Sequence, residues 1–265
     1  MGSFSFTLNE VNEMPINFTQ IIKDSFHFMQ NEKRNILLLS MLYFFVDIIM
    51  VWLQFVMLPN EIVMSLSNNQ IASTMSEEQG IDLVTFFFLK QFIYIFISAW
   101  CLVSIHQISL RRFHTIWQSF SSTLKRILGA ILLSFLIFIP ILIGLTEAMI
   151  AIQQKVQPSI ISLFAMVIGI GVYIRFCLAP VHYLLTNDSI SHSAKITWRA
   201  AMGRVSVLFI FCLLIYVLIP FVENFLTAFS SNAIMALISG ILVALINVFA
   251  LVVTYRFYTL FISKA

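Results

Sequence analysis

The segment of residues 188–220 joins two kinds of helix-forming sequence and strongly limits what the chain can fold into. Its first part, the polar start DSISHS followed by AKITWRAAMGR, has apolar residues from Ile190 onward at spacings of three and four, which predicts a helix with one apolar stripe. His192, Lys195 and Arg199 lie on the opposite side of that helix. From Val205 the segment becomes apolar. A basic amphipathic helix that continues into an apolar segment is typical of a helix that lies on a membrane and then enters it.

The composition agrees with a membrane protein. The chain is 60% hydrophobic and 10% charged, whereas soluble domains are about 45–50% apolar and about 25% charged. Its net charge is only +3, so we expect no nucleic-acid partner. The three cysteines lie in apolar segments and lack the spacing of zinc ligands, so we expect neither a metal site nor a cofactor.

Six apolar segments are long enough to cross a bilayer, which takes roughly 20 mostly apolar residues. We therefore predict an all-α polytopic fold with six transmembrane helices and three amphipathic interfacial helices. A polar leader is expected at 1–16, followed by a single transmembrane domain at 17–265. The predicted spans are 36–58, 84–108, 127–150, 159–185, 205–222 and a last one from 233 to about 255.

One short pattern occurs three times, at residues 28–34, 120–126 and 198–204. In each place an aromatic residue precedes an arginine by six positions, and the next residue begins an apolar segment. This predicts three repeats of an interfacial helix plus a transmembrane hairpin. The repeats would be approximately 17–108, 109–187 and 188–265. The alternative is that basic residues at the start of a span simply follow the positive-inside rule.

Basic residues also predict the orientation. With the N-terminus inside, twelve Lys and Arg residues fall on the inner side and only Lys90 and Lys155 on the outer side. This bias places both termini in the cytoplasm. It also places the polar loop at 59–82 outside.

Two opposite charges lie inside predicted spans. Asp47 and Arg175 are each twelve residues from the inner boundary, or roughly 18 Å at 1.5 Å per residue. Because isolated charges in a bilayer are costly, we expect an ion pair between the first and fourth spans, with a proton or ion relay as the alternative.

The remaining polar residues of the spans suggest structural roles. His106 and His182 lack a carboxylate or thiolate at matching depth, so interfacial histidines are expected instead of a metal site. Glu223, like Glu147, is expected near an outer end, in contact with water, and Asn247 is expected to hydrogen-bond another helix. The chain has no nucleophile elbow, phosphate loop or metalloprotease motif, so we expect no enzyme.

The three predicted interfacial helices would form a basic surface on the cytoplasmic side that binds anionic lipid headgroups. Each basic residue near the membrane surface adds roughly 1 kcal/mol of attraction to anionic lipid. The candidate lipid contacts are Lys33, Arg34, Arg111, Arg112, Trp117, Lys125, Arg126, Lys195, Trp198, Arg199 and Arg204.

Several short motifs occur in order along the chain: FMQNEKRNILLL at 28–39, MSEEQ at 75–79, LAPV at 178–181, TW at 197–198 with MGR at 202–204, and YRFY at 255–258. Together they resemble the YciC-like family of uncharacterised bacterial inner-membrane proteins. The resemblance implies six spans in a Gram-negative inner membrane and supplies no catalytic residues.

Three functions fit the sequence. The first is a multipass inner-membrane protein with a role in envelope or lipid homeostasis, acting through anionic lipids. The second is a small-solute or ion transporter, which needs a mid-depth cavity lined by Asp47, Arg175 or Asn247. The third is a factor that binds another membrane protein through its spans, as in immunity or assembly.

Overall fold

The computed structural model describes residues 16–58, 77–111, 115–154, 156–157, 159–229 and 232–263, and within these ranges all regular secondary structure is helical. The predicted leader, apart from Ile16, and the loop residues 59–76 lie outside the described part of the chain.

Within the described ranges, six helical segments are long and apolar enough to cross a membrane, as the sequence predicts. Two of them are interrupted, at Cys177–Leu178 in the fourth span and by a π-helical turn in the fifth. The spans are α2 (Lys33–Met57), α4 (Glu77–Ser109), α5 (Ile116–Gln153), α6 (Ile160–Phe176) with α7 (Ala179–Leu185), α9 (Val205–Leu213) with η1 (Leu214–Leu218) and α10 (Ile219–Ala228), and α11 (Ala233–Ser263).

Two of the expected interfacial helices are separate elements. Helix α1 (Phe18–Asn31) begins at Asn17, whose side-chain oxygen accepts hydrogen bonds from two backbone N–H groups. Helix α8 (Ile190–Ala201) ends before Gly203, which has a φ of +75°. Glycine adopts this left-handed conformation without steric cost, so the chain turns there into α9.

The third expected interfacial helix is not separate. Residues 116–126 form the first turns of α5, which continues without a break to Gln153. The segment between Leu124 and Ile127 contains no proline or glycine, so nothing in the sequence ends the helix there. The last span is also longer than predicted, because α11 extends to Ser263.

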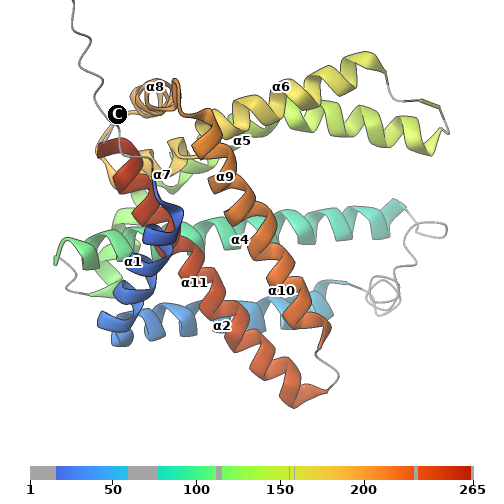
Figure 1. Ribbon diagram of the computed structural model, residues 1–265. Helices are drawn as coiled ribbons and strands as arrows, with labels where there is room; N and C mark the ends of the chain where they lie inside the picture. The colour runs from blue at the N-terminus through green and yellow to red at the C-terminus, as the bar shows by residue number, and fades with distance from the viewer. Residues whose placement is uncertain are drawn as a thin grey trace, which may run out of the picture.

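The helices come together at one end of the molecule and spread apart at the other (Figure 1). We call the first end, which holds α1, α7, α8 and the last turns of α11, the terminal end. The other end, with the last turns of α2, α5 and α10 and the first turns of α4, α6 and α11, is the hairpin end. There, the α5–α6 pair points away from the α10–α11 pair.

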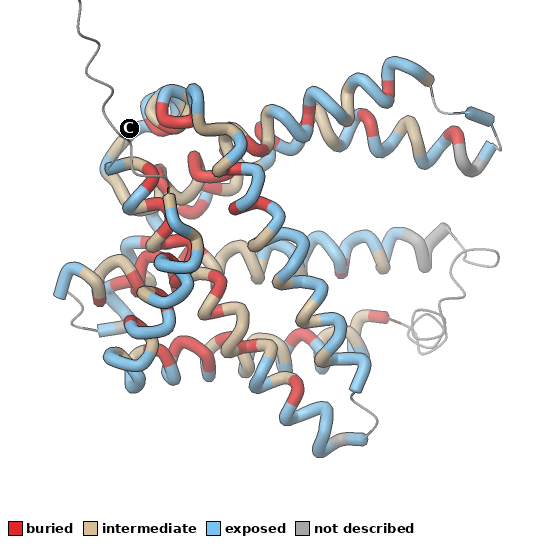
Figure 2. Tube along the Cα trace, in the orientation of Figure 1, coloured by how far each residue is buried: buried red, intermediate tan, exposed pale blue. Residues whose placement is uncertain are grey.

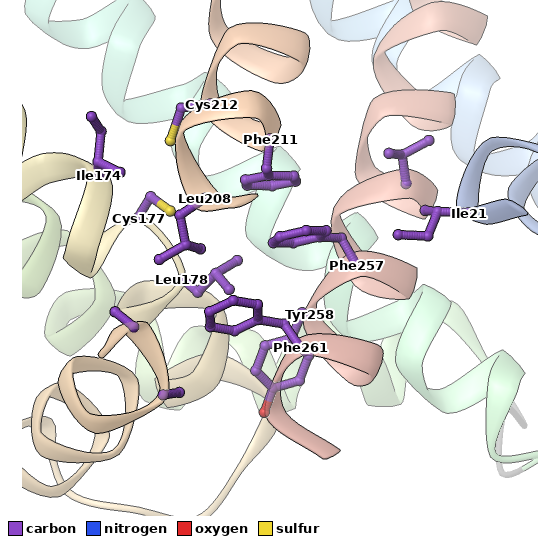
Figure 3. Packing of buried hydrophobic residues seen from close by; sticks show 13 residues of the cluster. Ile21, Ile174, Cys177, Leu178, Leu208, Phe211, Cys212, Phe257, Tyr258 and Phe261 are labelled. Atoms are coloured by element: carbon purple, nitrogen blue, oxygen red, sulfur yellow. The ribbon is translucent and has the colours of Figure 1, made fainter. Parts of the chain in front are cut away.

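Most of the buried core lies toward the terminal end (Figure 2). One buried cluster is centred on Phe257, whose ring stacks on Phe211 with centroids 4.2 Å apart (Figure 3). A second cluster includes Tyr43, Ile105 and Val252, from α2, α4 and α11. The two clusters fix the spans against one another at this end.

Helices α5 and α6 approach closely through small residues. A Cβ atom on Gly169 would lie 2.8 Å from the backbone nitrogen of Ile141, and one on Gly144 would lie 2.9 Å from the carbonyl oxygen of Ser162. The sequence predicts close packing at both Gly169 and Gly171. The prediction is confirmed for Gly169 and wrong for Gly171, which faces open space.

Candidate functional site

A cavity of about 470 Å³ lies at mid-depth between the spans, and all six spans contribute to its wall. Most of the wall is apolar, with residues such as Leu102, Ile137 and Leu251. The polar groups that line it include Tyr94 and Glu223. The centre of the bundle is therefore hollow, and we take this cavity as the candidate site.

Hydrogen bonds between α2 and α4 position one side of the cavity. The hydroxyl of Tyr94 donates a hydrogen bond to the carboxylate of Asp47. The hydroxyls of Tyr43 and Ser98 are 2.6 Å apart and share a second hydrogen bond. The ammonium of Lys90 lies 5.9 Å from the centroid of the Tyr94 ring. Asp47 thus reaches the cavity wall through Tyr94.

Arg175 has a different partner from the one expected. Its guanidinium lies 4.5 Å above the ring of Trp198, which also stacks on Phe176. Among the described residues, neither ion pair of the structure joins Asp47 to Arg175. The depth of a residue in its span does not fix the direction in which its helix turns the side chain, and the long Arg175 side chain reaches toward the terminal end.

The sequence suggested that Glu223 would lie at a water-exposed outer end. In the structure it lies on the cavity wall instead. Its Oε1 atom is buried and has no hydrogen-bond partner among the described residues. Asn247 also lines the cavity, and its amide donates to the carbonyl of Val243 in its own helix, not to another helix. Glu147, in contrast, accepts a hydrogen bond from the hydroxyl of Ser159.

The fifth span faces the cavity with an irregular stretch of backbone. In η1 the N–H of Ile219 bonds to the carbonyl of Leu214, five residues earlier. Pro220 follows and has no N–H to donate, which weakens the regular α-helical pattern at this point. Tyr216 and Pro220 line the cavity, and the Tyr216 ring meets that of Tyr173 edge-on at 5.3 Å. Short π-helical turns of this kind are frequent at functional sites.

A second polar cluster lies at the terminal end. His182 is hydrogen-bonded through Nδ1 to the hydroxyl of Tyr258 at 2.8 Å and through Nε2 to Asp188 at 3.0 Å. Burial raises the pKa of the Asp188 carboxyl, but hydrogen bonds from His182 and Thr186 outweigh this effect, so the pKa lies below its ordinary value. Arg126 donates to the backbone oxygen of Asp188 at 2.5 Å. This cluster ties α5, α7 and α11 together.

The two histidines flagged in the sequence have separate partners. Nδ1 of His106 lies 3.3 Å from the hydroxyl of Tyr255, whereas His182 contacts Tyr258. Within the described ranges, no group of three His, Cys, Asp or Glu side chains could hold a metal ion.

The described candidate lipid-contact residues are either half-buried or exposed. Three are half-buried: Arg126 bonds to the chain around Asp188, Trp198 lies under Arg175, and Arg204 lies at the start of α9. Arg112 lies outside the described residues. The exposed members are Lys33, Arg34, Arg111, Trp117, Lys125, Lys195 and Arg199.

The aromatic residues of the three predicted repeats make related contacts. Phe28 on α1 lies 5.0 Å from the guanidinium of Arg256 on α11. Phe120 meets Trp100 on α4, also at 5.0 Å. Trp198 on α8 lies under Arg175 on α6. Each aromatic thus packs against the second span of a different predicted repeat, while the repeat boundaries themselves stay a prediction.

The chain is similar over almost its whole length to a bacterial protein. A protein of Haemophilus influenzae described as "Uncharacterized protein" is 40% identical over 253 residues, which cover 94% of this chain and 100% of the relative. No family model matches the chain, and no solved structure matches it.

Proposed function

We propose that this chain, which belongs to the same family as the uncharacterised Haemophilus influenzae protein, binds a lipid-like molecule inside its transmembrane bundle. The chain would be a non-enzymatic multipass protein of the bacterial inner membrane with a role in envelope or lipid homeostasis. The observation that carries the proposal is the mid-depth cavity of about 470 Å³.

The cavity suits an amphiphilic ligand. Its volume falls within the roughly 300–1,000 Å³ of small-molecule sites, which are mostly apolar and carry a few polar groups that orient the ligand. Apolar walls would hold a hydrocarbon or ring portion. Glu223 lies close enough to Tyr94 and Asp47 to interact with both electrostatically, so the ligand's polar portion would be oriented toward them.

The surface charge supports a cytoplasmic terminal end. The described termini lie at this end (Figure 1), and Lys33, Arg34, Lys125, Lys195 and Arg199 are exposed. Exposed cations next to spans favour the cytoplasmic side and attract anionic headgroups. The YciC-like motifs favour an inner-membrane location. We also propose that the chain is a member of the YciC-like family.

A variant that fills the cavity tests the proposal. Ser134 lines the cavity on α5, so Ser134→Trp should reduce the amount of lipid that copurifies with the protein. Leu128 lies on the same helix and is 73% exposed, so Leu128→Trp is the matched control and should leave that amount unchanged. Native mass spectrometry of the detergent-purified proteins measures the retained lipid. Equal retention by the two variants would contradict the proposal.

A small-solute transporter is the second candidate, and the π-helical turn before Pro220 favours it. Discontinuous helices near the bilayer midplane are common at transporter binding sites. Uptake of labelled solutes into proteoliposomes distinguishes the candidates, because a lipid-binding protein without transport activity should give no uptake above that of empty vesicles.

A further inference from the structure

Resting on the proposed lipid-like ligand, we infer that the cavity selects an amphiphile with a cationic group, such as a protonated amine or another organic cation, held beside Glu223. The inference comes from the charge and the aromatic character of the cavity wall.

Glu223 is the only residue with a formal negative or positive charge among the described residues that line the cavity. Its Oε1 atom is buried without a hydrogen-bond partner in the described part of the chain. A carboxylate in a bilayer interior is costly unless a partner compensates it, and such residues usually mark a ligand or an ion path. A bound cation would supply the partner that none of the described residues provides.

The cationic side chains within the spans that make aromatic contacts do not line the cavity. Arg175 is over Trp198, Arg256 is over Phe28, and Arg126 is over the ring of Tyr183 at 4.3 Å. Lys90 lies near Tyr94 and interacts electrostatically with Asp47, which Tyr94 contacts. Neither ion pair found among the described residues involves Glu223, so its charge is left for a ligand.

Aromatic rings line the same cavity. Tyr94, Phe138, Tyr173, Phe176 and Tyr216 come from α4, α5, α6 and η1. The faces of such rings attract cations and are the usual means of binding organic ammonium groups. An anionic headgroup would meet the carboxylate of Glu223 and these electron-rich rings, so the cavity should disfavour it.

Equilibrium dialysis with two ions of nearly equal size and shape tests the charge preference. The purified protein should bind tetraphenylphosphonium more tightly than tetraphenylborate. Glu223→Gln removes the charge with little change in shape and should weaken tetraphenylphosphonium binding by at least about tenfold. The control is Glu147→Gln, because Glu147 is bonded to Ser159 and does not line the cavity. It should stay within about twofold of the unchanged protein.

A second arm identifies the source of the cation. In nanodiscs that contain equal amounts of phosphatidylethanolamine and phosphatidylglycerol, native mass spectrometry would show preferential retention of the amine lipid if the ligand is a membrane lipid. This preference should be lost in Glu223→Gln. Binding of tetraphenylphosphonium without any lipid preference would instead support a free organic cation as the ligand.

The outcomes separate this inference from the proposed function. Equal binding of the two ions, unchanged in Glu223→Gln but lost in Ser134→Trp, would overturn the cationic preference and leave the ligand cavity in place. If neither ion nor any lipid is retained, the proposed function fails together with the inference. A loss of folding in Glu223→Gln would show as a lowered Tm. In that case Glu223→Asp, which keeps the charge, should bind tetraphenylphosphonium within about tenfold of the unchanged protein, and weaker binding would count against the inference.

Discussion

Helix α11 passes through two different surroundings along its length. In its first turns, at the hairpin end, Ile234 is 70% exposed and Leu237 is 53% exposed. In its later turns Val248, Val252 and Phe257 are completely buried against the surrounding helices. The two portions are both strongly apolar in sequence, so hydrophobicity alone does not distinguish them.

The difference shows what holds a bundle of this kind together. Lipid solvates apolar side chains as well as protein does, so helices associate in a membrane by close packing and hydrogen bonding, not by hydrophobic burial. The terminal end has stacked rings and hydrogen-bonded tyrosines, whereas at the hairpin end the helices diverge. The cavity lies between the closely packed terminal end and the hairpin end, where the helices diverge.

The largest predicted effect compares two phenylalanines. Phe257 is 0% exposed and stacks on Phe211 and Phe261, whereas Phe164 near the hairpin end is 64% exposed. Phe257→Ala should lower the free energy of unfolding by about 3–5 kcal/mol because it leaves a cavity. Phe164→Ala should change it by less than about 0.5 kcal/mol. Denaturation in mixed micelles measures both, and equal losses would remove the distinction between the two ends.

The next prediction compares two glycines two residues apart on α6. Gly169→Ala places a Cβ atom against the backbone of α5 and should cost about 1–3 kcal/mol through overpacking. Gly171→Ala enters open space and should be neutral or gain up to about 1 kcal/mol from helix propensity. Thermal unfolding in detergent measures the difference. A destabilised Gly171→Ala variant would mean that α6 packs through another face.

The number and positions of the spans could be predicted from the sequence because each depends on a local run of apolar residues. The rotation of each helix about its axis depends on neighbours that are distant in sequence. Asp47 and Arg175 are equally far along the sequence from the inner ends of their predicted spans, which suggested that they pair. In the structure Asp47 contacts Tyr94 and Arg175 contacts Trp198.

The candidate site could be predicted only in part, for the same reason. The sequence identifies Asp47 and Asn247 as polar groups within spans, but it assigns Glu223 to the water-exposed end of its span. The available signal was its position three residues after Pro220 in an apolar segment. The aromatic wall that includes Tyr173 and Tyr216 has no local signal, because it forms only when several spans meet.

A smaller effect is expected for the tyrosine hydroxyls of the terminal end. Tyr258→Phe removes the 2.8 Å hydrogen bond to His182 and should cost about 1 kcal/mol. Tyr255→Phe removes the longer, 3.3 Å contact with His106 and should cost less. Comparing Tm values of the two variants measures the order. The opposite order would show that His106, not His182, is the stronger link between α11 and its neighbours.

The smallest effect is the pH dependence that Asp188 gives to the terminal end. Its pKa is lower in the folded protein than the ordinary value, so the fold favours its carboxylate form. That stabilisation is complete above the ordinary Asp pKa of about 3.9 and disappears as the pH falls through the lowered value. Asp188→Asn should therefore have a lower Tm than the unchanged protein at neutral pH, and the two Tm values should converge on acidification. The control, Asp24→Asn, alters a half-buried carboxylate on α1 that accepts a hydrogen bond from Gln20 and should shift Tm less. A difference for Asp188→Asn that persists at the acidic limit would mean that the residue stabilises the terminal end by its shape or hydrogen bonding and not by its charge.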